Sequence, residues 1–304
     1  MNIKRLLILF LIIGCLLNTC MPDLIENELP DLDDYEIVFQ SLGSGSKVLT
    51  FYNIETKKTY DLVFTREVTR PIVSHSERVI PVLHTHDNFA GLIDLETERL
   101  KSCSGWPNNW IAADPQGQGP YDIILATTSN VYRYDLKNCE ISEMLFDMDN
   151  YRDIVKYDGG LMGFSITPDE EQLYIGKAGW DSPTKYTLFM LELEDGELFK
   201  TGVGISPSVS NGGTLLAYFS YDGLYLLDLT SQITEKLLDF PKPNTVYPPQ
   251  IFWSADDKEL LFHFEPQRKE GSLFDDLEIV VFNIEKKEKT ILPVKGLYPS
   301  WIQE

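Results

Sequence analysis

A recurring hairpin motif constrains the fold of this chain more than any other feature. In GLIDLETERL, which begins at Gly91, an apolar strand is followed by Asp, Leu, a polar turn and a second strand. Related segments occur along the whole chain, spaced by roughly 45 residues. Their acidic or amide residues are Asn53, Asp94, Asp135, Glu192, Asp228 and Asn283. Since Asp and Asn side chains can hydrogen-bond to a turn backbone, we expect these residues to form turns.

A second pattern precedes the hairpin in most repeats and consists of a strand, a polar turn and another strand. Its clearest copies are WSADDKELLF from Trp253, VSNGGTLLAY from Val209 and FSITPDEEQLYI from Phe164. Together the two patterns give four short strands per repeat, and almost no segment has a sustained helical period. The sequence therefore predicts an all-β, six-bladed β-propeller with four antiparallel strands in each blade.

The second pattern also resembles a known repeat. Residues 254–262 (SADDKELLF) and 167–174 (TPDEEQLY) look like the Ser-Pro-Asp-Gly-Lys-x-Leu-x-Phe repeat of TolB-type propellers, which are distant relatives of WD-repeat proteins. The resemblance covers roughly residues 36–304 and implies the propeller fold. It implies no particular activity.

The two ends of the chain are expected to close the ring. The C-terminal segment YPSWI, from Tyr298, repeats SPSVS from Ser206, which we assign to the innermost strand of a blade. No blade follows the C-terminal copy, and the N-terminal segment 36–39 (EIVF) has no inner strand before it. We therefore expect the last strand to complete the first blade, which would remove the exposed sheet edges of an open ring.

The first 20 residues form a separate segment with the layout of a bacterial export signal. Lys4 and Arg5 precede an apolar run that is short for a membrane-spanning helix. The segment ending at Cys15 resembles the lipobox of bacterial lipoproteins, and Cys20 is an alternative lipidation site. Simple cleavage and an uncleaved anchor remain open. Each alternative predicts an extracytoplasmic protein of the cell envelope, either membrane-anchored or secreted. Residues 21–35 are acidic and suit an extended tether, so the propeller domain is assigned to residues 36–304.

The composition limits the partners and the cross-links of this domain. The formal net charge of −21 disfavours binding to nucleic acid, because phosphate backbones are also negative. Only Cys103 and Cys139 lie in the body of the chain. Strand order places Cys103 late in an outer strand and Cys139 just after a turn at the opposite face. The sequence therefore predicts no disulfide between them. Oligomeric state is not indicated.

Loop length distinguishes the two faces of the predicted ring. The loops between the second and third strands, and the crossovers between blades, share one face and are long and irregular. Long loops on one face indicate a binding face for a protein or cell-envelope component. Aromatic, Arg and acidic residues in these loops are the candidate binding residues, whereas Trp110 and Trp253 are assigned to the core. The candidates are Trp106, Trp180, Asp181, Tyr247 and Arg268.

Catalytic motifs are scarce in this sequence. His84, His86 and Asp87 form the one cluster with metal-ligand residue types, since residues i and i+2 of a strand share a face. No nucleophile elbow, phosphate-binding loop or dinucleotide-binding glycine pattern occurs, and no cofactor is expected. A non-catalytic binding propeller is thus the primary hypothesis. The alternatives are a lactonase- or sugar-dehydrogenase-like propeller enzyme with a metal or cofactor at its axial mouth, and a purely structural ring.

Overall fold

The computed structural model describes most of the chain as β-structure. It covers residues 23–24, 28–42, 47–64, 71, 73–74, 79–84, 89–94, 99–103, 110–119, 122–135, 137–155, 159–179, 182–240, 250–264 and 277–303; in some strands only the backbone is described. These residues form 25 strands and two short 3₁₀ helices, η1 (Leu32–Asp34) and η2 (Met148–Tyr151). None of the helices in these ranges is long and apolar enough to cross a membrane.

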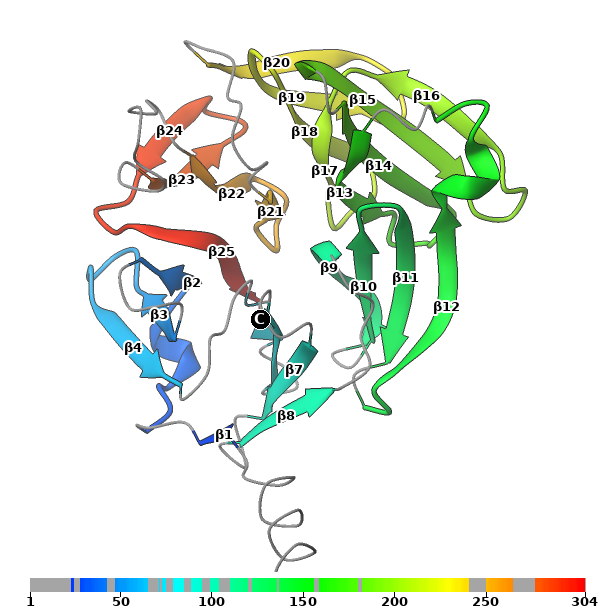
Figure 1. Cartoon of the computed structure of the whole chain (residues 1–304). Coiled ribbons are helices and arrows are strands. Elements are labelled where there is room, and N and C mark those ends of the chain that lie inside the picture. Colours follow the sequence, from blue (N-terminus) through cyan, green and yellow to red (C-terminus); the bar gives the residue numbers. More distant parts are fainter. Residues whose placement is uncertain are drawn as a thin grey trace, which may run out of the picture.

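The strands form five hydrogen-bonded sheets that surround a central axis (Figure 1). Four of them have four antiparallel strands each, as the repeat predicts. Sheet II contains β9 (Trp110–Gly119), β10 (Asp122–Thr127), β11 (Asn130–Asp135) and β12 (Glu140–Asp147). Sheet III contains β13 (Gly159–Ile166), β14 (Gln172–Gly179), β15 (Ser182–Glu192) and β16 (Leu198–Gly202). Sheet IV contains β17 (Ile205–Val209), β18 (Leu215–Ser220), β19 (Gly223–Asp228) and β20 (Thr234–Asp239). Sheet V contains β21 (Phe252–Trp253), β22 (Glu259–Phe264), β23 (Glu278–Asn283) and β24 (Glu288–Ile291).

Sheet I has nine strands, and it corrects the predicted number of six separate four-stranded blades. Its order is β1-β8-β7-β6-β5-β25-β2-β3-β4. These strands are β1 (Asp23–Leu24), β2 (Ile37–Ser41), β3 (Val48–Tyr52), β4 (Thr59–Val63), β5 (Val73–Ser74), β6 (Val79–His84), β7 (Phe89–Asp94), β8 (Arg99–Cys103) and β25 (Gly296–Gln303). The count is five sheets because β25 uses both of its edges: it pairs with β2 on one side and with β5 on the other.

The C-terminal strand β25 closes the ring beside β2, which confirms the expectation that it completes the first blade. β25 pairs antiparallel with β2, with Ile37 opposite Trp301 and Val38 opposite Ser300. The chain packs against this sheet before Glu36, since Leu32 in η1 is buried. Part of the stretch 21–35, expected as an extended tether, is therefore packed structure.

The core lies between neighbouring sheets, where alternate residues of each strand meet those of the next sheet. Ile124 and Phe146 of sheet II share one cluster with Ile166 and Leu173 of sheet III. A second cluster fills the space between sheets III and IV, and a third lies between sheets IV and V. Sheets III and IV are thus buried on both faces, so the fold depends on contacts between neighbouring sheets.

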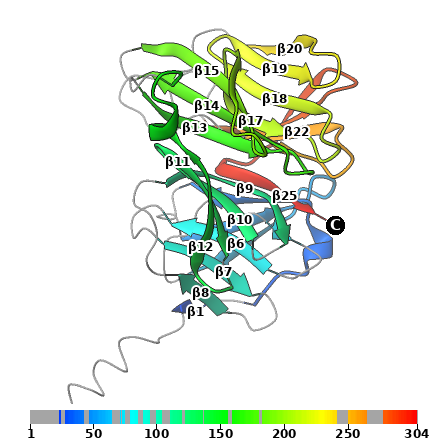
Figure 2. The same cartoon turned by 90° about the vertical axis from the view of Figure 1, so that its right-hand side faces the viewer.

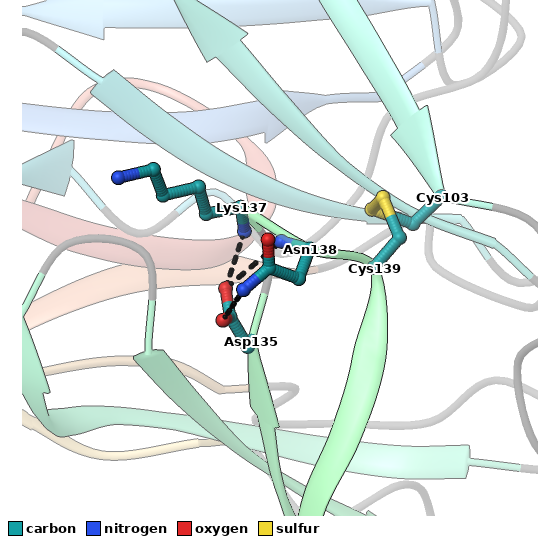
Figure 3. The surroundings of a disulfide bond; sticks show 5 residues. All are labelled: Cys103, Asp135, Lys137, Asn138 and Cys139. Carbon is teal, nitrogen blue, oxygen red and sulfur yellow. Dashed lines mark hydrogen bonds between the residues drawn. A yellow bond between two sulfur atoms is a disulfide. The ribbon is translucent and has the colours of Figure 1, made fainter.

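Cys103 and Cys139 form a disulfide, so the prediction of no bridge is wrong (Figure 3). Their Cα atoms are 5.0 Å apart, within the usual range for bridged cysteines. Cys103 ends β8, the outer strand of its group, and Cys139 lies in the turn before β12. Twist accumulates from the inner to the outer strands of a sheet. As Figure 1 shows, β8 therefore runs along the rim of the ring toward sheet II rather than along the axis. The sequence prediction considered strand direction alone, and it therefore placed Cys103 at the opposite face of the ring from Cys139.

Candidate functional site

Most residues predicted to form a site lie outside the described part of the chain. These are Trp106, Trp180, Asp181, Tyr247, Arg268, His86, Asp87 and the lipidation candidates Cys15 and Cys20. For His84, which ends β6, only the backbone is described. The roles of these residues therefore stay predictions. Within the described ranges, no three His, Cys, Asp or Glu residues are grouped in a way that could hold a metal ion.

Trp253 belongs to the core, as the sequence predicts. Its side chain is 4% exposed, and its indole Nε1 donates to the backbone oxygen of Ser208 at 3.0 Å. This bond joins the inner strands of sheets IV and V. Trp110 begins β9, and only its backbone is described.

Four of the described turns between third and fourth strands use their acidic or amide side chain internally, as predicted: those of Asn53, Asp135, Asp228 and Asn283. Asp228 Oδ1 accepts from the backbone N–H groups of Thr230 and Ser231 at 2.9 and 2.8 Å. Asp135 does the same with Lys137 and Asn138 (Figure 3). These donors favour the ionised carboxylate, and the Ser231 N–H contributes most to lowering the pKa of Asp228. The carboxylates therefore hold the turns.

These turns also share one backbone conformation that the sequence motif did not reveal. Four residues after each acidic or amide residue, the backbone has a positive φ. The five described examples are Lys57, Cys139, Gly196, Gln232 and Lys287. Glycine fills the position once, although it adopts this conformation at the lowest cost. The repeat therefore fixes a geometry rather than a residue type.

The turns between the first and second strands tie neighbouring sheets together. The Asp257 carboxylate of sheet V accepts from the backbone N–H groups of Asn211 and Gly212 in sheet IV, at 2.8 and 2.7 Å. The Asn211 side chain donates to the same carboxylate at 2.9 Å. Asp257 thus closes over the turn of the preceding sheet.

A second inter-sheet bridge lies at the same end of the ring, between sheets II and III. The Arg133 guanidinium reaches both carboxylate oxygens of Glu170, at 3.1 and 2.9 Å. Glu170 occupies the same turn position as Asp257, and both have positive φ. Paired donors and acceptors make this contact stronger than a single ion pair.

Both kinds of turn lie at one end of the sheets, which we call the turn face. In sheets III, IV and V a backbone bond joins the two turns: Leu193 N–H to Glu171 O, Leu229 N–H to Thr214 O, and Ile284 N–H to Lys258 O, each at 2.9 Å. The polar groups described above are therefore engaged in holding the ring together. The opposite end, where the sequence has its long loops, is called the loop face.

Three of the inner strands contain a similar irregularity. Gly163 (φ 98°), Ser206 (φ 50°) and Tyr298 (φ 50°) have positive φ, and the strand pairing shifts register beside each of them. Ser206 and Tyr298 each precede a proline. The Ser-Pro and Tyr-Pro pairs mark inner strands in the sequence but do not predict this conformation, because a residue before proline is normally extended, with a negative φ.

Buried polar contacts cross between sheets at these irregular positions. The Tyr298 N–H donates to Nδ1 of His263, at 3.3 Å, and this imidazole is 4% exposed. The Ser206 hydroxyl donates to Met162 O at 3.4 Å. Since Nδ1 of His263 accepts a hydrogen bond, Nδ1 itself carries no proton. These hydrogen bonds to neighbouring sheets fix the backbone of the inner strands at the irregular positions.

The loop between β18 and β19 is a described part of the loop face that reaches solvent. Tyr221 is 43% exposed at its tip. Beside it, Lys236 Nζ pairs with Asp222 at 2.8 Å and with Asp239 at 2.7 Å, and Tyr225 donates its hydroxyl to Asp222 at 3.0 Å. The Lys236 ammonium lowers the pKa of Asp222, and its two carboxylate partners raise the pKa of Lys236. The network lies beside the exposed Tyr221 and ties Asp222, in the same loop, to β19 and β20.

Comparison of the sequence with family models and with curated proteins finds no match. Comparison of the structure finds 1250 similar solved chains, so the arrangement is shared by many proteins and says little by itself about activity.

Two of these solved structures illustrate the range. TolB from Acinetobacter baumannii superposes with a TM-score of 0.62 at 12% identity, over 88% of this chain and 66% of the TolB chain. The chain thus spans just under two thirds of the TolB chain. A chain in the crystal structure of a nidogen/laminin complex superposes with a TM-score of 0.60 at 9% identity, over 88% of this chain and 99% of that one. At these identities the likeness shows the β-propeller fold alone.

Proposed function

We propose that this chain is an exported, lipid-anchored β-propeller that binds a protein or another cell-envelope component through its loop face, without catalysis. The observation that carries the choice of face is the use of the polar groups on the turn face. Asp135, Asp228, Asp257 and Glu170 all bond within the ring. The loop face, by contrast, presents Tyr221 to solvent.

Export is supported by the disulfide as well as by the N-terminal sequence. Disulfides persist in oxidising compartments and are rare in reducing ones. The Cys103–Cys139 bridge therefore agrees with an extracytoplasmic location. Lipidation at Cys15, or at Cys20, is proposed from the sequence.

Binding of a macromolecule is supported by analogy. The nidogen/laminin structure is that of a complex, and this chain superposes on 99% of one of its chains. The acidic surface of the present chain, with its net charge of −21, favours a basic partner.

We also propose that the two antiparallel groups of strands within sheet I each correspond to one blade, which would give the ring six blades in five hydrogen-bonded sheets. Within sheet I, β25, β2, β3 and β4 form one antiparallel group, and β5 to β8 form another. The two groups are joined by a parallel pairing of β25 with β5 over two residue pairs. The six sequence repeats support counting each group as a blade.

Partner capture with matched variants tests the proposed binding face. The full-length protein is cross-linked in native envelopes, and the captured partner is quantified for Trp106→Ala, Trp180→Ala and Tyr221→Ala. We expect at least about a tenfold loss of capture for a variant at the centre of the interface, with an unchanged melting temperature. Phe199→Ala, on the outer strand β16 and 41% exposed in the native protein, is the control and should capture normally. Loss of capture in the control alone would place the binding surface on the rim.

A further inference from the structure

A narrow junction joins the two halves of sheet I, one made of β25, β2, β3 and β4 and the other of β5 to β8. β25 and β5 pair in parallel through Ile302 opposite Val73 and Gln303 opposite Ser74. Parallel pairing is slightly less stable per residue than antiparallel pairing, and two residue pairs contribute little. We call this junction the seam. Other contacts must help to hold it closed.

Residues 28–35, which we call the strap, pack into the core on both sides of the seam. Leu32 is 6% exposed and belongs to a cluster with Phe51 and Leu62 from one half of sheet I and Ile93 from the other. Leu29 and Tyr35 of the strap and Ile302 of β25 pack against the same cluster. Buried apolar side chains of this kind are costly to withdraw, so the strap stabilises both halves together.

Polar contacts hold the strap on the half that contains β2, β3 and β4. The Asn53 amide donates to Asp34 O at 2.7 Å, and the Tyr60 hydroxyl donates to Glu28 O. The Tyr35 ring lies edge-on to Phe51, with centroids 6.0 Å apart.

The chain reaches the other half of sheet I just upstream of the strap. There β1 adds to the outer edge of β8, with Asp23 opposite Leu100 and Leu24 opposite Arg99. Figures 1 and 2 show β1 beside β8 at the rim of the ring. The N-terminal residues therefore contact both halves of the sheet from outside, while β25 and β5 join them from inside.

We propose that the strap is a latch for the ring: its docking keeps the seam closed, and its release opens the β25–β5 pairing while the other sheets stay folded. The device follows from the position of the strap over the seam and does not depend on the proposed binding function. It also couples the closure of the ring to the segment through which the protein would be anchored.

Hydrogen exchange followed by mass spectrometry on the full-length protein tests this latch. Tyr60→Phe removes the hydroxyl bond to Glu28 and keeps the ring, and Leu32→Ala empties the core position of the strap. Tyr151→Phe is the control for the first variant, because the Tyr151 hydroxyl donates to Gly196 O between sheets II and III at 3.0 Å. Leu198→Ala, on β16 and 8% exposed in the native protein, is the control for the second.

The latch predicts faster exchange at the seam alone. Amides of β5 and of the end of β25 should exchange about fivefold faster in Tyr60→Phe, the equivalent of one lost hydrogen bond, and at least about tenfold faster in Leu32→Ala. Sheets III to V should be unchanged in both variants, and the controls should leave the seam unchanged. Faster exchange confined to the strap, or a uniform increase in all sheets, would overturn the proposal. Should Leu32→Ala fail to fold, Tyr60→Phe decides.

Discussion

At the scale of single residues, the repeat specifies backbone geometry more strictly than residue identity. The described turns between third and fourth strands place Lys, Cys, Gly, Gln and Lys at one left-handed position. A non-glycine residue there costs roughly 1–2 kcal/mol. The turn bonds of residues such as Asp228 and Asn53 offset this cost and keep the hairpin in register.

Gly196 offers a clean test of this position, since its φ is 69° and its nearest non-neighbouring atom, the Tyr151 hydroxyl, would lie 3.7 Å from an added Cβ. Gly196→Ala should therefore lower the free energy of unfolding by about 1 kcal/mol through backbone strain, without a clash. Urea denaturation measures the difference. Gly202→Ala is the matched control, because an added Cβ there meets nothing within 4 Å. A control as destabilising as Gly196→Ala would contradict the argument.

Asp222 should make stability depend on pH in a defined direction. Its pKa is lowered, chiefly by Lys236, so its contribution is complete above the unfolded-state pKa of about 3.9 and is lost as the pH falls through the lower folded-state pKa. Asp222→Asn should therefore be less stable than the wild type by up to about 1 kcal/mol at neutral pH. The difference should shrink below about pH 4. Urea midpoints at stepwise lower pH measure it, and a difference that grows in acid would refute the assignment.

At the scale of elements, the turns do two jobs: they reverse the chain, and they bridge neighbouring sheets. Asp257 receives three hydrogen bonds from sheet IV through one carboxylate. Its neighbour Asp256 pairs within its own turn, with Lys258 and Ser254. Asp257 therefore links two sheets, whereas the adjacent Asp256 makes contacts within its own turn.

Alanine substitutions at these two positions should differ in cost. Asp257→Ala removes charge-assisted bonds across the junction and should destabilise the protein by about 2 kcal/mol. Asp256→Ala removes exposed local contacts and should cost less than about 1 kcal/mol. Thermal unfolding monitored by circular dichroism gives both values. Equal losses of stability would mean that the bonds from Asp257 to sheet IV contribute no more than a surface ion pair.

The sequence predicted the elements well and their junctions poorly. Alternation and turn residues place most described strands, because they depend on neighbours in the chain. The disulfide escaped prediction because it depends on how far β8 twists toward sheet II, which no local pattern records. The seam escaped for a similar reason: β5 and β25 are far apart in sequence, and their two-residue pairing leaves no motif. The loop sequences that contain the candidate binding residues do not identify a partner, so the roles of these residues stay predictions.

At the scale of the whole molecule, a covalent or polar contact links the neighbouring sheets at each junction of the ring. The disulfide links sheets I and II, and the Arg133–Glu170 ion pair links sheets II and III. The Asp257 carboxylate links sheets IV and V. Between sheets III and IV, the Val209 N–H donates to Ser165 Oγ at 3.0 Å. The Trp301 indole donates to Phe252 O between sheets V and I, at 3.3 Å. Because the ring closes on itself, loosening one junction should weaken its neighbours.

Removing the disulfide tests how much this covalent link stabilises the ring. It closes a loop with a sequence separation of 36 residues, for which chain entropy gives a stabilisation of about 4 kcal/mol. The Cys103→Ser, Cys139→Ser double variant should lose stability on that order, and the wild type should lose as much under reductant. Intact mass after alkylation verifies the oxidised starting state. A double variant as stable as the oxidised wild type would show that the bridge does not hold the ring.

The central claim is that one face of the ring is committed to structure and the other to binding. Hydrogen exchange of the protein with and without its captured partner measures this most directly. The account predicts slower exchange in the loop-face peptide that spans residues 218–224. It predicts no change in the turn-face peptides that span residues 210–215, 228–233 and 254–259. Protection of those turns, with the loop between β18 and β19 unaffected, would contradict it.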